Sequence, residues 1–167
     1  MNVVAIDPGN VQSAYAVIQV DGFYPIAFGK VPNSELAQML KESEKLNQSR
    51  YVIERVACYG MPVGREVFDT CEWIGRFAQI IKDFRGKDAD YILRMDEKIA
   101  ICNNSRANDG NIRRALIDRF ALHDFKNGKG TKNHPDFFYG FSADMWAAYA
   151  VGYTYIERGL KGSERHG

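Results

Sequence analysis

The chain has 167 residues, of which 46% are hydrophobic, 26% charged and 13% aromatic. This composition excludes collagen-like, disulfide-scaffold and wholly disordered proteins, and a chain of this length can bury roughly 68–70% of its unfolded surface in one domain. The formal net charge is +1, from 22 Lys and Arg against 21 Asp and Glu. The total charge therefore gives no indication of a strongly basic nucleic-acid-binding protein.

The N-terminal part of the chain predicts three strands in an antiparallel meander. Runs of apolar and β-branched residues define these strands, at residues 3–6, 13–20 and 23–31. The first run stops at the turn-forming residues Asp7-Pro8-Gly9. The dipeptide Asp21-Gly22 between the other two runs is a strong hairpin signal.

Helices and shorter strands are expected over the rest of the chain. Helical spacing of apolar residues predicts a helix from Ser34, which caps it, and helices at 67–81, 111–122 and 143–157, the last capped by Ser142. Further strands are expected at 51–53 and 91–93, and a mobile loop at 127–134. This order predicts an α/β domain with a mixed sheet covered by helices, spanning residues 1–157, followed by a frayed tail at 158–167.

The three cysteines, Cys58, Cys71 and Cys102, form no Cys-x-x-Cys pair and stand in apolar surroundings. We therefore expect buried free thiols, as in a cytoplasmic protein. We expect neither a signal peptide nor a membrane span, because Met1–Ile6 reaches Asp7 before a long apolar run develops and no apolar stretch approaches ~20 residues.

Three acidic residues occupy positions from which their side chains can converge. Asp7 and Glu54 each end a predicted buried strand, and ligands of open α/β sheets collect at the carboxyl ends of strands. Asp144 lies in the first turn of the last predicted helix, on the face of Ala147 and Ala148. Converging carboxylates repel one another, and an oxygen-preferring divalent cation such as Mg²⁺ or Mn²⁺ relieves the repulsion. The three acids together therefore predict a metal site.

Each acid alone also fits a simpler role. Asp7 precedes Pro-Gly and can be a turn residue that bonds its own backbone. Glu54 can form a surface ion pair with Arg55, and Asp144 can stabilise a helix N-terminus through the helix dipole. Convergence of the three at one side of a sheet distinguishes the metal site from these alternatives.

The same acids lie in segments that resemble the RuvC-type Holliday junction resolvases of the ribonuclease H-like superfamily. The matching stretches are Val3-Val4-Ala5-Ile6-Asp7-Pro8-Gly9, Val52-Ile53-Glu54-Arg55-Val56, Trp73-Ile74-Gly75-Arg76, the basic segment 105–116, and Ser142-Ala143-Asp144-Met145-Trp146-Ala147-Ala148-Tyr149-Ala150. The resemblance covers residues 1 to about 157, and the compact form of the motifs is similar to phage or mobile-element versions of the family.

The resemblance implies a ribonuclease H-like mixed five-stranded sheet flanked by helices. It implies cleavage of phosphodiesters in four-way or other branched DNA by a homodimer in recombination and repair, with Mg²⁺ as cofactor and Mn²⁺ able to substitute. Asp7, Glu54 and Asp144 are the implied catalytic metal ligands, and Lys98 falls where the family places a catalytic lysine.

The sequence departs from the family pattern at two places. Three residues before the last aspartate the family has Asp or His, whereas this chain has Phe141, which cannot bind a metal. His134 and Asp136, just upstream, are candidates to replace this ligand; otherwise the site is degenerate and inactive. A second family lysine is also missing near Asp109, and Arg106 is the candidate to compensate.

Basic residues concentrate in one segment. Residues 98–132 carry a net charge of +5 and the remainder carries −4. Such a local patch can bind phosphates, so Arg106, Arg113 and Arg114 are candidate DNA contacts, although a solvated basic helix face is the alternative. In the loop 58–64, which the resembled family places near the junction centre, Tyr59 and Met61 are candidates to stack on unpaired bases; core packing is the alternative for them.

Three functions remain as hypotheses. The first is a metal-dependent, junction-selective endonuclease, and the second is a catalytically degenerate protein that binds branched DNA, which Phe141 favours. The third is a nucleotide phosphotransferase of the actin-like class, which the length of the chain opposes because such enzymes need a second domain of this kind.

Overall fold

The computed structural model describes the backbone of residues 1–163, and side chains up to residue 159. Five strands form one mixed sheet in the order β3-β2-β1-β4-β5. The antiparallel meander consists of β1 (Asn2–Asp7), β2 (Gln12–Gln19) and β3 (Tyr24–Pro32), and the parallel strands are β4 (Arg50–Arg55) and β5 (Asp90–Leu93). This is the predicted ribonuclease H-like sheet.

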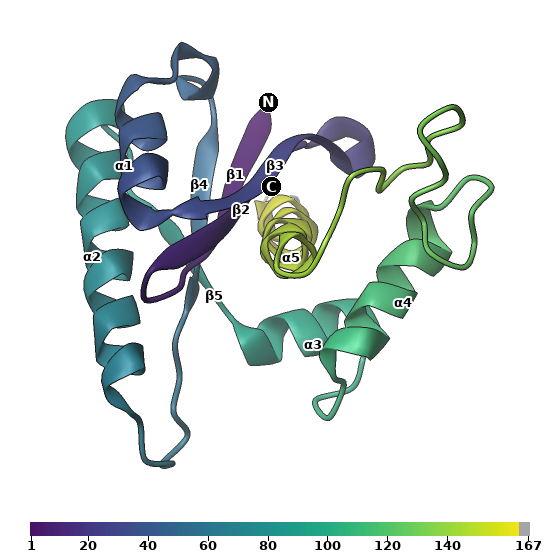
Figure 1. Ribbon diagram of the computed structural model, residues 1–167. Coiled ribbons are helices and arrows are strands. Elements are labelled where there is room, and N and C mark those ends of the chain that lie inside the picture. The colour runs from purple at the N-terminus through teal and green to yellow at the C-terminus, as the bar shows by residue number, and fades with distance from the viewer. Residues whose placement is uncertain (164–167) are drawn as a thin grey trace.

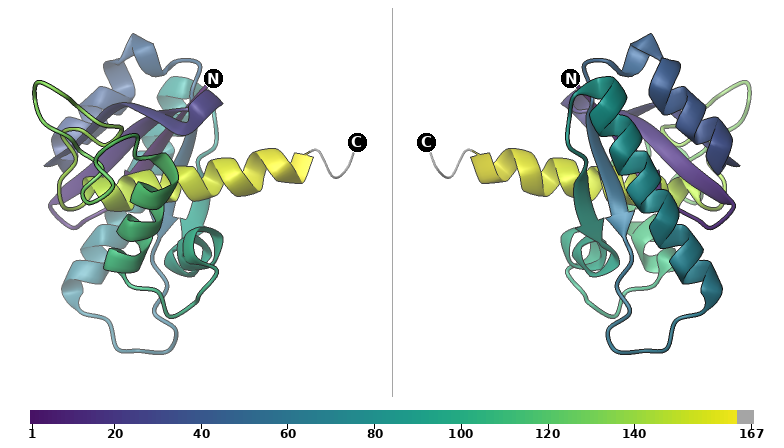
Figure 2. Two further views of the ribbon diagram at one scale, coloured as in Figure 1. Left: turned by 90° about the vertical axis from the view of Figure 1, so that its right-hand side faces the viewer. Right: turned by 90° about the vertical axis from the view of Figure 1, so that its left-hand side faces the viewer.

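Helices cover both faces of the sheet (Figures 1 and 2). One face carries α1 (Asn33–Glu42) and α2 (Arg65–Arg85). The opposite face carries α3 (Arg94–Cys102), α4 (Asp109–Phe120) and α5 (Met145–Ser163). Short 3₁₀ turns occupy Asp21–Phe23 and Glu44–Leu46. None of the helices in this described part of the chain has both the length and the apolar character needed to cross a membrane.

Strand alternation assigns each buried side chain to one of two cores. In β1, Val4 and Ile6 pack with α1 and α2, whereas Val3 and Ala5 pack on the face of α5. Asp7, the next residue in this alternation, therefore belongs to the α5 face. The helix α5 lies close to the sheet because Gly152 has no side chain: a Cβ there would meet Ile18 Cδ1 at 2.5 Å and the Ala5 Cβ at 2.9 Å.

The helix boundaries differ from the sequence expectations at several points. The helices α2 and α4 each begin two residues earlier than expected, and larger differences concern α3, α1 and α5. The helix α3 follows β5 directly and was not expected. The helix α1 already begins at Asn33, so Ser34 lies inside it instead of capping it. The helix α5 begins at Met145 and runs to Ser163, past the expected end at 157, and residues 164–167 lie outside the described part of the chain. The Ser142 hydroxyl contacts the Met145 sulfur, not a backbone N–H.

Two other expectations about loops and thiols are wrong. Cys58 and Cys71 are exposed and Cys102 is partly exposed, because Cys58 lies in the loop after β4 and Cys71 lies on the outer side of α2; all three are free thiols. The segment expected to be mobile is folded around the carboxylates of Asp124 and Asp136, which accept hydrogen bonds from backbone N–H groups on both sides of it.

Candidate active site

Four strands contribute to one row of side chains on the α5 face of the sheet. Asp7 pairs in register with Ala14 of β2, and Ala14 pairs with Lys30 of β3. On the other side of β1, Ile6 pairs with Ile53, so Asp7 and Glu54 follow at the same level of two parallel strands. The two carboxyl groups influence each other's pKa. The sequence prediction that Asp7 and Glu54 converge agrees with this arrangement.

The turn after β1 is held by a small polar network. The buried Ser13 hydroxyl donates to Asn33 Oδ1 at 2.6 Å and accepts from the Gly9 N–H at 3.1 Å, while Asn33 Nδ2 donates to the Gly9 carbonyl at 2.9 Å. A side chain at Gly9 would meet the Gln12 carbonyl oxygen at 2.2 Å. The Asp7-Pro8-Gly9 motif is thus a rigid turn that ends β1 beneath a cleft of about 330 Å³.

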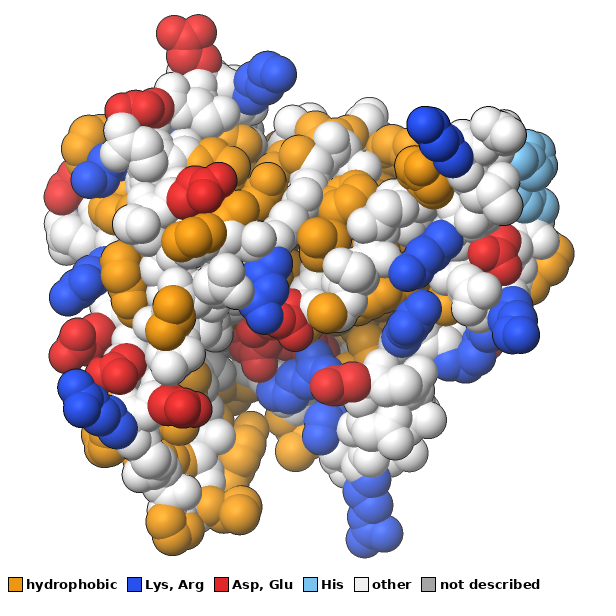
Figure 3. Space-filling model, in the orientation of Figure 1, with side chains coloured by type: hydrophobic (Ala, Val, Ile, Leu, Met, Phe, Trp, Pro, Cys, Tyr) orange, Lys and Arg blue, Asp and Glu red, His pale blue; other side chains and the backbone are white. Residues whose placement is uncertain are grey.

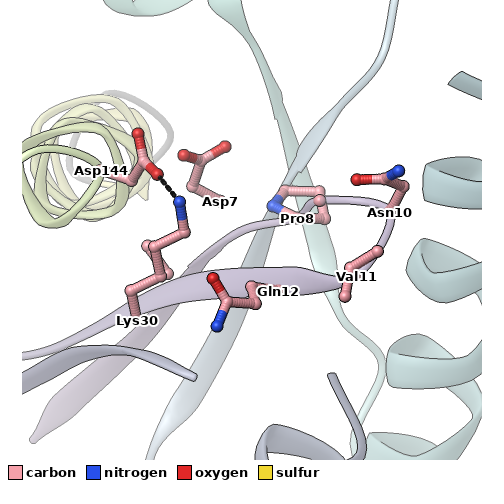
Figure 4. Close-up of a pocket in the computed structure, with 9 residues that line it drawn as sticks. Asp7, Pro8, Asn10, Val11, Gln12, Lys30 and Asp144 are labelled. Carbon is pink, nitrogen blue, oxygen red and sulfur yellow. Dashed lines mark hydrogen bonds and ion pairs between the residues drawn. The ribbon is translucent and has the colours of Figure 1, made fainter. Parts of the chain in front are cut away.

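Asp144 enters the same cleft from the residue just before α5, and not from the first turn of the helix as the sequence analysis expected. Figure 4 shows its carboxylate pointing toward Asp7 and forming an ion pair with Lys30. The Asp144 side chain is 46% exposed, so it is accessible from solvent and not aimed wholly at the sheet as the sequence pattern suggested. The structure nevertheless brings the three predicted acids together across β1, β4 and α5.

A fourth acidic side chain, Glu97 of α3, lies in the same cluster. It is completely buried, and its Oε2 atom forms an ion pair with Arg94. The other guanidinium nitrogen of Arg94 binds Asp109, which is exposed. The Glu97 Oε1 atom has no hydrogen-bond partner among the described residues. The sequence analysis singled out neither Arg94 nor Glu97.

The carboxyl groups hold their protons unusually tightly. Burial, followed by the charges of Glu54 and Asp144, raises the pKa of Asp7 to about 8. Burial also raises the pKa of Glu54, against the lowering effect of Arg94. Burial and the charge of Glu54 raise the pKa of Glu97 to about 9, although Arg94 lowers it. The common cause is the cost of placing several carboxylates in one poorly solvated site.

The donor set suits a divalent cation that prefers oxygen ligands, such as Mg²⁺ or Mn²⁺. Among the described residues, the ion pairs of Asp7, Glu54, Glu97 and Asp144 come from two bases, Lys30 and Arg94, and Arg94 also pairs with Asp109. Full ionisation therefore leaves at least two uncompensated negative charges. Within residues 1–163, however, no three His, Cys, Asp or Glu side chains are already grouped as a metal site. Asp144 is instead paired with Lys30, and Glu97 with Arg94.

The two residues considered as replacements for the missing family ligand do not join this cluster. All four hydrogen bonds of the buried Asp136 carboxylate come from backbone N–H groups, those of Leu122, His123, Asp124 and Phe137. His134 stacks on the ring of His123 at 4.0 Å between centroids, and the histidines lie at the edge of the molecule, away from the central acidic cluster (Figure 3).

Phe141 is an aromatic core residue. Its side chain is 1% exposed and its ring packs against Phe28, Phe138, Trp146 and Tyr149, with centroids 4.4 to 5.7 Å away. The position at which the resembled family has a ligand therefore serves the core on the α5 face of the sheet.

The predicted basic contacts surround the acidic cluster unevenly. Lys98 is half-buried on α3, next to Glu97 in sequence, and no contact joins it to a carboxylate among the described residues. The Arg113 guanidinium lies 4.9 Å from the centroid of Trp146, beside a small pocket that Asp144 also lines. Arg106 is exposed in the α3–α4 connection. Figure 3 shows Lys and Arg side chains bordering the central red cluster.

Arg114 is already engaged within the protein. Its guanidinium pairs with Asp118 and donates to the carbonyls of Phe125 and Lys126. It therefore ties α4 to the following loop. Tyr59 and Met61, in contrast, are 66% and 72% exposed in the β4–α2 loop, so the alternative that they pack in the core is wrong.

Three residues of the site were missed, and the signals for them differ. Lys30 is identified only by the β2–β3 register, which the sequence does not reveal. Glu97 could have been found from helical spacing, because Arg94, Glu97 and the buried Ile101 fall at i, i+3 and i+7. The helix that carries them was not recognised, since nine residues directly after a strand give a short periodic pattern.

These elements form a mixed five-stranded α/β fold that matches the fold of solved RuvC structures. The solved structures that are similar to it include RuvC of Thermus thermophilus, with a TM-score of 0.69 over 97% of both chains. They also include the T. thermophilus RuvC in complex with a Holliday junction substrate, with a TM-score of 0.70 over 97% of this chain and 96% of that one. Both are 15% identical to this chain. The sequence matches no protein-family model and no curated protein.

Proposed function

We propose that this protein is a divalent-metal-dependent endonuclease that cuts phosphodiesters in four-way or otherwise branched DNA. The observation that carries the proposal is that Asp7 and Asp144 line one cleft at the end of β1, with Glu54 at the same level of the neighbouring strand. The likeness to a RuvC that was solved with a Holliday junction substrate supports the choice of DNA as the substrate.

Asp7, Glu54 and Asp144 are the residues that would hold Mg²⁺ or Mn²⁺. A bound cation of this kind would supply an activated water and charge stabilisation for the displaced oxygen in phosphodiester hydrolysis. The bases act alongside it. Lys30 and Arg94 reduce the repulsion among the acids. Lys98 is the residue that the family resemblance implies as a catalytic lysine, and its ammonium would stabilise the charge on the phosphate.

The surface beside the site supports binding to a nucleic-acid backbone. Arg113, held over Trp146, and the exposed Arg106 offer guanidinium groups to phosphates on the α4 side of the cleft. On the other side, the exposed Tyr59 and Met61 offer apolar surfaces to unstacked bases. We further propose that two copies act together on one junction, and the apolar residues exposed around the start of α2 support this, including Val63 and Phe68.

A synthetic four-way junction tests the catalytic proposal. With Mg²⁺ the wild-type protein is expected to nick the junction symmetrically, whereas Asp7→Asn binds it without cutting. Asp21→Asn, which makes the same change at an exposed turn, is the control and is expected to cut normally. Sedimentation of the complex distinguishes one bound copy from two.

The second candidate function is a branched-DNA-binding protein without nuclease activity. The burial of Phe141 in the core favours it, because the ligand of the resembled family is absent from that position. Junction binding without cleavage in either Mg²⁺ or Mn²⁺ would select this function. Failure to bind junctions at low salt would exclude both functions.

A further inference from the structure

The structure assigns a fourth ligand to the proposed cation site: we propose that Glu97, not a residue near position 141, completes the carboxylate set. The inference rests on the proposed metal dependence and deepens it. It begins from the unusual state of the Glu97 side chain, which is completely buried yet leaves one carboxylate oxygen without a hydrogen-bond partner. Such an oxygen is costly to bury unless something binds it.

The two oxygens of Glu97 are in different situations. Oε2 is held by Arg94, whose guanidinium is itself fixed through its second nitrogen to Asp109. This double contact orients the carboxylate and leaves Oε1 available. The sheet register brings α3 to this site: Glu54 pairs with Ile92 of β5, and α3 begins at Arg94, two residues further on, so Glu97 lies in the first turn of the helix that starts beside Glu54.

The position of Glu97 compensates for the loss at Phe141. The ring at position 141 fills the core between Phe28, Phe138 and Trp146, so a ligand there would have to replace a packed aromatic side chain. Glu97 comes from α3, which directly follows the strand that pairs with Glu54. A carboxylate supplied by α3 restores four acidic ligands without disturbing the aromatic core.

Titration of the metal-free protein with Mn²⁺ alone, followed by calorimetry, tests this inference. Removing an oxygen ligand while keeping the shape is expected to weaken Mn²⁺ binding about tenfold or more in Glu97→Gln. The Mn²⁺-induced rise in melting temperature should shrink in parallel. Glu66→Gln, the same change at an exposed position on α2, is the control and should keep the wild-type affinity.

Each outcome separates the two proposals. If Glu97→Gln binds Mn²⁺ within threefold of wild type while Asp7→Asn does not bind it, the role of Glu97 is refuted and the metal-dependent function survives. If the wild type does not bind Mn²⁺, both fail. If Glu97→Gln does not fold, Glu97→Asp replaces it in the test, because aspartate keeps the charge opposite Arg94 but has a shorter side chain. Glu97→Asp is expected to weaken Mn²⁺ binding, and wild-type affinity for Mn²⁺ in this variant would overturn the inference.

Discussion

Replacing Asp136 with asparagine separates a structural role from a metal-binding role for this carboxylate. In the folded protein Oδ1 accepts the N–H groups of Leu122 at 2.8 Å and Phe137 at 2.6 Å, and Oδ2 accepts those of His123 at 2.9 Å and Asp124 at 2.6 Å. An asparagine amide has one acceptor oxygen, so two N–H groups lose their acceptor and face an NH₂ group instead.

The expected loss of stability is large. A hydrogen bond to a charged group contributes about 1.5–3 kcal/mol, so losing two lowers the free energy of unfolding by about 3–6 kcal/mol. Burial raises the pKa of Asp136, but the four backbone N–H groups lower it more, so the pKa lies well below its ordinary value. The carboxylate therefore stabilises the fold above pH ~4, and this contribution is lost as the pH falls below that value.

Urea unfolding at several pH values measures this effect. The gap between wild type and Asp136→Asn is expected to be widest near neutral pH and to narrow below pH ~4, while Asp83→Asn, an exposed acid on α2, changes stability little. A loss below about 1 kcal/mol, combined with loss of Mn²⁺-induced stabilisation, would refute the structural role and restore Asp136 as a candidate metal ligand.

Three further predictions concern the site and its surroundings. Because the pKa of Asp7 is raised to about 8, the metal-free fold loses stability as the pH rises from 4 to 8. At pH 7 in EDTA, chemical denaturation should find Asp7→Asn more stable than wild type by up to about 4 kcal/mol. Equal stability of the two proteins would contradict the raised pKa. Arg113→Ala should weaken junction binding and reduce the dependence of log affinity on log salt concentration by about one. Arg114→Ala should instead mainly lower the melting temperature, because its side chain is bonded within the protein. The reverse pattern would exclude Arg113 as the phosphate contact. Gly152→Ala should lower the free energy of unfolding by about 1–2 kcal/mol through overpacking against Ala5. The control Gly159→Ala, whose added Cβ would make only an ordinary contact at 3.9 Å, should be neutral or stabilising. Equal effects of the two substitutions would argue against close packing at position 152.

The sheet and the first acids of the site could be predicted because their signals are local. A β-rich run that ends at Asp7 and another that ends at Glu54 define two strands, and parallel pairing then brings their ends together. The hairpin signal at Asp21-Gly22 predicted the meander, and Gly22 has the positive φ of 79° that makes glycine favourable there. These features depend on a few consecutive residues each.

The residues that neutralise and complete the site depend on contacts distant in sequence. Lys30 and Asp144 are 114 residues apart, and they meet only because the β2–β3 register and the start of α5 coincide. Asp136 looked like a metal ligand from its position upstream of Asp144, but folding of the 121–138 segment gives its carboxylate four backbone partners. Composition and local spacing carry no information about such contacts between distant segments.

The positive and negative charges of the chain lie in different parts of the sequence. A net +1 averages a basic segment, residues 98–132, with an acidic remainder, and the fold places Arg113 of that segment beside Asp144 of the cleft. The two bases in the cleft, Lys30 and Arg94, are fewer than its four acids, so ionising all four acids at once would leave the cleft anionic. The raised pKa values of Asp7 and Glu97 avoid this near neutral pH, because both carboxyl groups keep their protons in the metal-free protein. A divalent cation offsets the two excess charges and makes an acidic cleft compatible with a basic rim and a polyanionic substrate. The excess of acids over bases is therefore the physical reason to expect that the four acids ionise together only when a cation is bound.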